Sequence, residues 1–289
     1  MENKQQQNPE LLKIIKAQTE LLRISLHLST QGPTTYAGEE LRCNLNQAKL
    51  KTSQLIAMSA GQSVNTILKC AEWKGIPVRD LYPVARSTIE SFINAAFLLV
   101  EDDSVAQRAE RYVAFKAWKQ LNRKVGSGDF SLQISMPQSD KYAIPSEFAE
   151  FDGRGNEGWT KLDLSSRFHR VGELAGKKAG SRLLAAYSLV YSLSSEIIHG
   201  SPYGVNYFYQ AHLPANPTIE DFQISTAKQV EDLLVAISHA VAGYLAAFFK
   251  FQGMSAPYIA EQELFNRLLE LESVEPQEIE RLERKTTPM

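Results

Sequence analysis

Apolar residues recur at steps of three and four along most of the chain, which is the spacing of one face of an α-helix. Alternation of apolar and polar residues, the pattern of a half-buried strand, is scarce. The pattern therefore predicts an all-α fold, a multi-helix bundle. We expect helices near residues 9–29, 39–74, 78–100, 103–124, 163–178, 180–199, 218–252 and 257–272.

Residues 125–160 interrupt this pattern with seven glycine and proline residues and no sustained apolar period. We expect a long irregular excursion there that is mobile and is cut first in limited proteolysis. It is not a domain boundary, because both flanks are similar helical material. The prediction is a single helical domain over 1–289, with N-terminal helices (1–76), a motif-bearing core (77–252), and a C-terminal helix with an acidic tail (253–289).

The run from Leu233 to Phe249 is apolar enough for a decision between a membrane span and a buried core helix. Glu231 and Asp232 abut one end of the run, and no basic cluster marks a cytoplasmic side. We therefore favour a core helix and expect no membrane contact.

Composition is that of an ordinary globular protein, with 44% hydrophobic and 22% charged residues. A formal net charge of −2 excludes coating of nucleic acid through bulk charge, so such contact needs a local patch. Residues 108–124 carry six basic side chains against Glu110 alone, and 161–182 are basic too. These helices are either solvated faces or a means of attracting phosphate. Two cysteines and no apolar leader lead us to expect a cytoplasmic protein.

The sequence does not support a dinucleotide-binding site or a metal site. Gly153, Gly155 and Gly158 have the spacing of a dinucleotide-binding loop, but the strand before it and the helix directly after it are lacking. We interpret them as a flexible loop. The five histidines are scattered without a second ligand at metal-binding spacing, so we expect no metal and no cofactor.

A first polar constellation interrupts the apolar helix expected over 78–100. Arg86, Ser87, Glu90, Ser91 and Asn94 share one wedge of the helix, while the rest of its surface is apolar. The wedge is either a partly exposed face or interhelical ion pair, or part of a functional site.

A second constellation lies on the helix expected over 180–199. Tyr187, Tyr191, Ser195 and His199 are spaced four apart, so they form a slanted polar stripe. Gly200 is the expected left-handed cap, which places His199 in the last turn. There His199 either bonds the free carbonyls or acts in proton transfer, because the helix dipole favours its charged form.

The motifs R-S-x-x-E-S-x-x-N (86–94), E-R-Y (110–112) and S-S-x-x-x-H-G-S (194–201) together resemble a large uncharacterised family of bacterial all-helical proteins, over residues 81–207. More loosely, a helical bundle with a histidine at a helix end is similar to the HEPN superfamily of metal-independent ribonucleases. Those proteins carry R-x-x-x-x-H on one helix. Ser194 stands at that arginine position here, so Arg86 would have to supply the arginine.

The resemblance implies an HEPN-like endoribonuclease that acts as a toxin or phage-defence effector, with RNA bound through the local basic helices. His199 would be the general acid/base, Arg86 would bind the phosphate, Glu90 would orient them and Tyr191 would supply a hydroxyl. The alternative is a non-catalytic helical module that senses a ligand or binds a protein. A homodimer or a regulatory protein partner fits either function. We expect Arg86 and Glu90 to meet His199 in one pocket.

Overall fold

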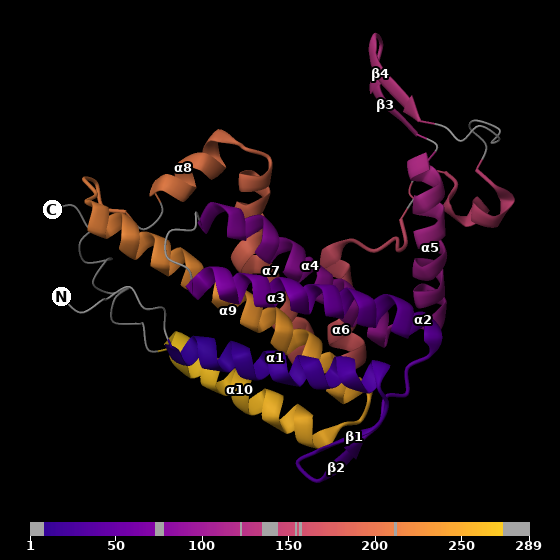
Figure 1. Cartoon of the computed structure of the whole chain (residues 1–289), viewed down its shortest axis with the longest axis horizontal. Helices are drawn as coiled ribbons and strands as arrows, with labels where there is room; N and C mark the ends of the chain where they lie inside the picture. The colour runs from indigo at the N-terminus through magenta and orange to yellow at the C-terminus, as the bar shows by residue number, and fades with distance from the viewer. Residues whose placement is uncertain are drawn as a thin grey trace.

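The computed structural model describes residues 9–72, 78–121, 123–134, 144–153, 155, 158–210 and 213–273. Long helices run side by side in a bundle, and the only strands in these residues form two small hairpins (Figure 1). The predicted all-α class is therefore confirmed. The acidic tail after residue 273 lies outside the described residues.

The longest helix, α9 (Ile219–Phe251), forms the centre of the bundle. It begins with a capping box, in which the Thr218 side chain and Asp221 bond each other's backbone N–H groups. Its second half is buried all round, because α1 (Pro9–Thr30), α4 (Leu81–Val100), α7 (Lys177–Ile198) and α10 (Ser255–Ser273) pack against it. It is the one described helix long and apolar enough to cross a membrane, yet 89% of its apolar window is buried, as in the core of a soluble protein.

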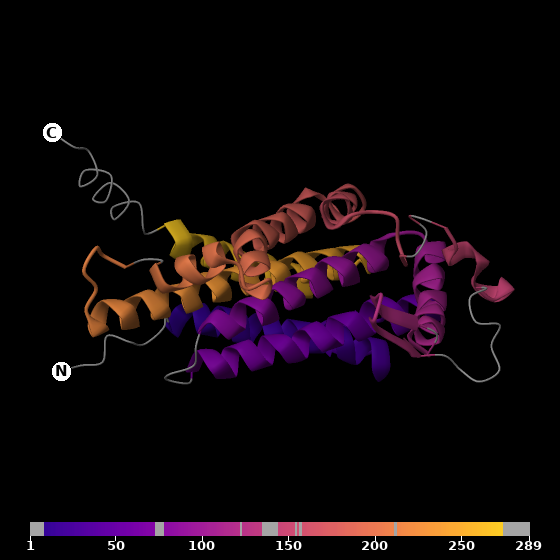
Figure 2. The same cartoon turned by 90° about the horizontal axis from the view of Figure 1, so that it is seen from above.

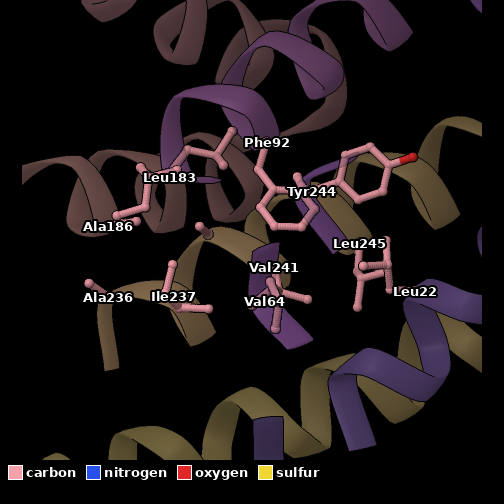
Figure 3. Close-up of a cluster of buried hydrophobic side chains, with 14 of the residues drawn as sticks. Leu22, Val64, Phe92, Leu183, Ala186, Ala236, Ile237, Val241, Tyr244 and Leu245 are labelled. Atoms are coloured by element: carbon pink, nitrogen blue, oxygen red, sulfur yellow. The ribbon is translucent and has the colours of Figure 1, made fainter. Parts of the chain in front are cut away.

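Side chains from several helices meet around α9 in the core (Figure 3). Phe92 of α4 and Leu183 of α7 lie close to Tyr244 and Val241 of α9, and Val64 of α3 (Leu55–Glu72) lies below them. Gly243 permits the close contact of α7 with α9, since a Cβ there would lie 2.7 Å from the Leu183 side chain. This packing fixes the relative position of α4 and α7, the two helices that carry the polar stripes.

The prediction of a helix over 39–74 is wrong for its first residues, 39–46. Residues Thr34–Tyr36 (β1) and Glu39–Leu41 (β2) form a hairpin, because Ala37 and Gly38 take the positive φ angles of a tight turn. The helical path begins at α2 (Gln47–Lys49), where the Asn46 side chain accepts from the Lys49 N–H, and continues through a π-helical segment, η1 (Leu50–Gln54), into α3. Cys43 thus precedes the helix, and both cysteines are free.

The prediction of a helix over 103–124 is wrong for its last residues. Helix α5 (Asp103–Leu121) stops, and β3 (Arg123–Ser127) pairs antiparallel with β4 (Phe130–Ile134). The expected excursion thus begins as a regular hairpin. Beyond it, the 3₁₀ helix η3 (Ser146–Phe151) returns to α5, where Glu150 bonds Arg108 and Arg111. The predicted mobility of this excursion stays a prediction, and residues 135–143, 154 and 156–157 lie outside the described chain.

The remaining helices agree with the pattern within a few residues, with one addition. Helix α4 follows a short 3₁₀ turn, η2 (Val78–Asp80), and α6 (Leu164–Ala175) is separated from α7 only by Gly176. Helix α8 (Pro202–Gln210) occupies a segment for which the apolar pattern predicts no helix. Turn chemistry starts it, because the Ser201 side chain accepts from the Gly204 N–H and Pro202 suits the first helical position.

Candidate functional site

Helices α4 and α7 lie side by side and run in opposite directions. The order of contacts shows this, because Arg79, just before α4, reaches the Ile197 carbonyl near the end of α7, while Arg86 lies over the earlier residue Tyr191. The two polar stripes that the sequence indicates therefore face each other across one helix pair. Of the predicted site residues, Arg86, Glu90 and Tyr191 thus lie together.

Arg86 is the centre of the site. Its Nε donates to Glu90 Oε1 at 2.8 Å, and its guanidinium lies 4.2 Å from the ring centroid of Tyr191. The side chain is 19% exposed and that of Glu90 34%. Within the described chain, the Nη groups of Arg86 and the second oxygen of Glu90 have no hydrogen-bond partner. The site therefore presents donors and an acceptor that a ligand can use.

The tyrosines of α7 form the wall of the site beside Arg86. The rings of Tyr187 and Tyr191 stack with centroids 4.3 Å apart, and Phe168 of α6 packs on Tyr187 at 5.7 Å. Burial raises the pKa of Tyr187 and the neighbouring Tyr191 raises it further, while the positive charge of Arg86 acts in the opposite direction. The Tyr187 hydroxyl is consequently protonated at neutral pH, and a hydrogen bond joins it to Tyr191.

A second arginine, which the sequence analysis did not single out as a site residue, extends the site along α4. Arg167 of α6 donates from Nη1 to Asn94 Oδ1 at 2.6 Å, and its Nε and Nη2 both donate to the Leu162 carbonyl. Its guanidinium lies 4.7 Å from the Trp159 ring centroid. Burial lowers the pKa of Arg167, whereas the charges of Asp163 and Glu90 oppose this. The one feature of the sequence that points to Arg167 is its position in the basic stretch 161–182.

The structure does not bring His199 to Arg86. His199 is the exposed C-cap of α7, eight residues beyond Tyr191. At a rise of about 1.5 Å per residue, this separates the two residues by roughly 12 Å along the helix. No hydrogen bond or ion pair joins His199 to Arg86 or Glu90 among the residues that the structure describes. The predicted single pocket is therefore replaced by a site at Tyr191.

The H-G-S motif after α7 forms the turn into α8. Gly200 has φ 63° and donates to the Ile197 carbonyl, and the Ser201 N–H donates to the Glu196 carbonyl. This pair of bonds is a Schellman motif, so the left-handed cap expected at Gly200 is confirmed. A Cβ at Gly204 would lie 2.7 Å from the Glu196 backbone, which shows how closely α8 packs on the end of α7. The motif thus has a structural role of its own.

Many cations of the two basic stretches are engaged within the protein. Arg170 pairs with Glu101 and Glu173, and Arg182 makes a buried ion pair with Glu261 at 2.7 Å. Arg108 and Arg111 bind Glu150. These side chains brace the bundle and η3. Among the described residues, no group of three histidine, cysteine or carboxylate side chains is placed to hold a metal ion.

Comparison with known proteins places the middle of the chain in a helical domain without an assigned activity. No curated protein and no solved structure matches the chain. One family model matches the chain over residues 73–213, and this segment includes residues 81–207, which carry the motif resemblance. Residues 73–213 match a family of unknown function (DUF5677), and this part of the chain is thus an uncharacterised helical domain.

Proposed function

We propose that this protein is a ligand-binding module that recognises an oxyanion, such as a phosphate group, through Arg86. The observation that supports this is the state of the Arg86 side chain. It is largely buried and held from two sides by Glu90 and Tyr191, but its Nη groups have no partner within the described chain. A guanidinium fork fixed in this way is preorganised for bidentate binding of a phosphate or carboxylate.

The neighbours of Arg86 narrow the ligand class. Glu90 has a carboxylate oxygen without a partner in the described chain, which can accept a hydrogen bond, and the stacked rings of Tyr187 and Tyr191 form a wall beside Arg86. A ligand that carries an anionic group together with hydroxyl or amino donors satisfies both Arg86 and Glu90. A nucleotide has this combination, with a phosphate for Arg86 and ribose hydroxyls for Glu90. We therefore expect a mononucleotide or a nucleotide unit of RNA as the ligand.

Calorimetric titration with AMP and with a short single-stranded RNA tests this proposal. We expect Arg86→Ala to weaken binding by at least about tenfold, the equivalent of ~1.4 kcal/mol. Arg86→Lys should also weaken it, because lysine keeps the charge but loses the fork. The matched control is Arg23→Ala, which removes an exposed arginine paired with Glu20 on α1 and should leave binding unchanged.

Two results would contradict ligand binding at Arg86. Arg86→Ala could bind both probes as the unsubstituted protein does, which would make the pair with Glu90 purely structural. The unsubstituted protein could also bind neither probe.

The second candidate function is metal-independent RNA cleavage in the cytoplasm, as a toxin or phage-defence effector. One observation favours it: His199 is exposed on the helix that carries Tyr191, and its imidazole has no hydrogen-bond partner in the described chain. General acid–base chemistry, however, requires both groups to reach one phosphodiester, so a single chain in this conformation lacks the assembled pair.

Incubation of labelled RNA with the protein, with and without a chelator, separates the two candidates. Cleavage that resists the chelator and is lost in His199→Ala supports the nuclease. RNA that is bound through Arg86 but stays intact in the same samples supports the ligand-binding module.

A further inference from the structure

Helix α5 and the β3–β4 hairpin form an arm at one end of the molecule. The first half of α5 is fastened to the bundle, where Lys49 pairs with Asp103 and Lys51 with Glu110. Beyond this point the arm extends away from the bundle, and the hairpin projects at its tip (Figures 1 and 2). We call β3 and β4 the hairpin surface.

One face of the hairpin surface is apolar and exposed. The strand register pairs Val125 with Leu132 and Ser127 with Phe130, and residues paired in this way share a face. Phe130 is 91% exposed and Leu132 62%. A two-stranded hairpin alone is marginally stable in water, and an exposed apolar face of this kind is typical of an interaction site.

A second apolar surface lies at the opposite end of the long axis. It consists of α8 and the first turns of α9, which we call the α8–α9 surface (Figures 1 and 2). Ile219 is 81% exposed and Tyr203 63%, and Phe222 and Ile224 are exposed as well. Helix α8 packs on the end of α7. Burial, and then the negative charge of Asp232 on α9, raises the pKa of Tyr207 on α8.

The two surfaces carry opposite charge. From residue 116 to 134, the arm has four basic side chains against one acidic one: Lys116, Lys119, Arg123 and Lys124 against Asp129. From residue 196 to 232, which covers the end of α7, all of α8 and the first part of α9, the chain has five acidic side chains against one basic one: Glu196, Glu220, Asp221, Glu231 and Asp232 against Lys228. The chain as a whole is nearly neutral, so this is a separation of charge between its two ends.

We propose that the hairpin surface of one copy docks on the α8–α9 surface of a second copy, head to tail. Each apolar face then covers the other, and the basic arm meets the acidic end. Symmetric pairing of either surface with itself brings like charges together, which disfavours it. A head-to-tail contact is heterologous, so it continues into rings or open chains of copies. This proposal is independent of the Arg86 site.

Light scattering on size-separated protein tests the assembly. The full chain should show a mass that rises above the monomer with concentration and falls with added salt. Two variants remove one surface each: Phe130→Ser with Leu132→Ser on the hairpin, and Ile219→Ser with Phe222→Ser on α9. Each should be monomeric under conditions where the full chain assembles. Ile259→Ser on α10, at a site 56% exposed and outside both surfaces, should assemble normally.

Mixing the two monomeric variants distinguishes head-to-tail docking from other contacts. The hairpin variant retains an intact α8–α9 surface and the α9 variant an intact hairpin, so the mixture should give a complex of twice the monomer mass that grows no further. Circular dichroism checks that each variant is folded. The proposal is overturned if the full chain stays monomeric at all concentrations, if only one variant loses assembly, or if the mixture stays monomeric. Loss of RNA binding in the hairpin variant without a change in mass would make nucleic acid the occupant instead.

Discussion

Arg86 and Arg167 show two uses of an arginine beside the same glutamate. The guanidinium of Arg167 donates to the Leu162 carbonyl and to Asn94, so it joins α6 to the preceding loop and to α4. Among the described residues, Arg86 hydrogen-bonds Glu90 alone, and its guanidinium lies over the Tyr191 ring. The guanidinium of Arg167 is used in hydrogen bonds that hold the fold together, whereas that of Arg86 keeps donors that a ligand can use. This difference is why Arg86 is the centre of the proposed function.

At the end of α7, the free energy of unfolding should depend on Gly204 rather than on His199. Gly204→Ala places a methyl group within 2.7 Å of the Glu196 backbone, and we expect it to lower the free energy of unfolding by about 1–3 kcal/mol. His199→Ala removes an exposed side chain and should change it by less than about 0.5 kcal/mol. Urea unfolding of both variants measures this. A larger loss in His199→Ala than in Gly204→Ala would mean that the imidazole, and not the glycine turn, holds this end.

Among the elements, the long helices could be predicted from the sequence because their apolar period is sustained over many turns. The β1–β2 and β3–β4 hairpins and α8 could not, because local turn chemistry determines them. Ala37 and Gly38 turn the first hairpin, and Ser201 caps α8.

The polar stripes of the site could be predicted, but their register could not. Each stripe follows from the residues of one helix, whereas the side chain that faces Arg86 depends on how far α4 slides along α7. Packing of both helices on α9 sets this offset. It places Tyr191, rather than His199 two turns later, under Arg86. Arg167 was missed as a site residue for the same reason, because its contact with Asn94 joins residues on two separate helices.

The attachment of η3 to α5 should depend on pH through Glu150. The hydrogen bond from Arg111, then the charges of Arg111 and Arg108, hold the pKa of Glu150 below its ordinary value of 4.5. A carboxyl pKa that is lower in the folded state stabilises the fold above pH 4.5, and this contribution is lost as the pH falls through the folded pKa.

Glu150→Gln should therefore lower the free energy of unfolding by up to about 1 kcal/mol at neutral pH, and by much less near pH ~3. Urea unfolding at the two pH values measures the difference, with Glu40→Gln, in an exposed pair with Arg42, as the control. An effect of Glu150→Gln that is equal at both pH values would show that the ion pairs contribute nothing.

The whole molecule is organised around α9, which contacts α1, α3, α4, α7 and α10. The N-terminal helices and α10 therefore complete the same core as the segment matched by the family of unknown function. We expect one cooperative unfolding transition, with the same midpoint by far-ultraviolet circular dichroism and by tryptophan fluorescence. Two transitions with separate midpoints would divide the chain into independent folding units.

Nuclear magnetic resonance of the arginine side chains tests most directly whether Arg86 binds a ligand. In a titration of nitrogen-15-labelled protein with AMP, the Nε–H signal of Arg86, assigned through its loss in Arg86→Lys, should shift and reach saturation. The signal of Arg23, whose guanidinium is paired with Glu20 at the surface, should not move. An Arg86 signal that stays in place while other signals of the protein shift to saturation would contradict the proposed site.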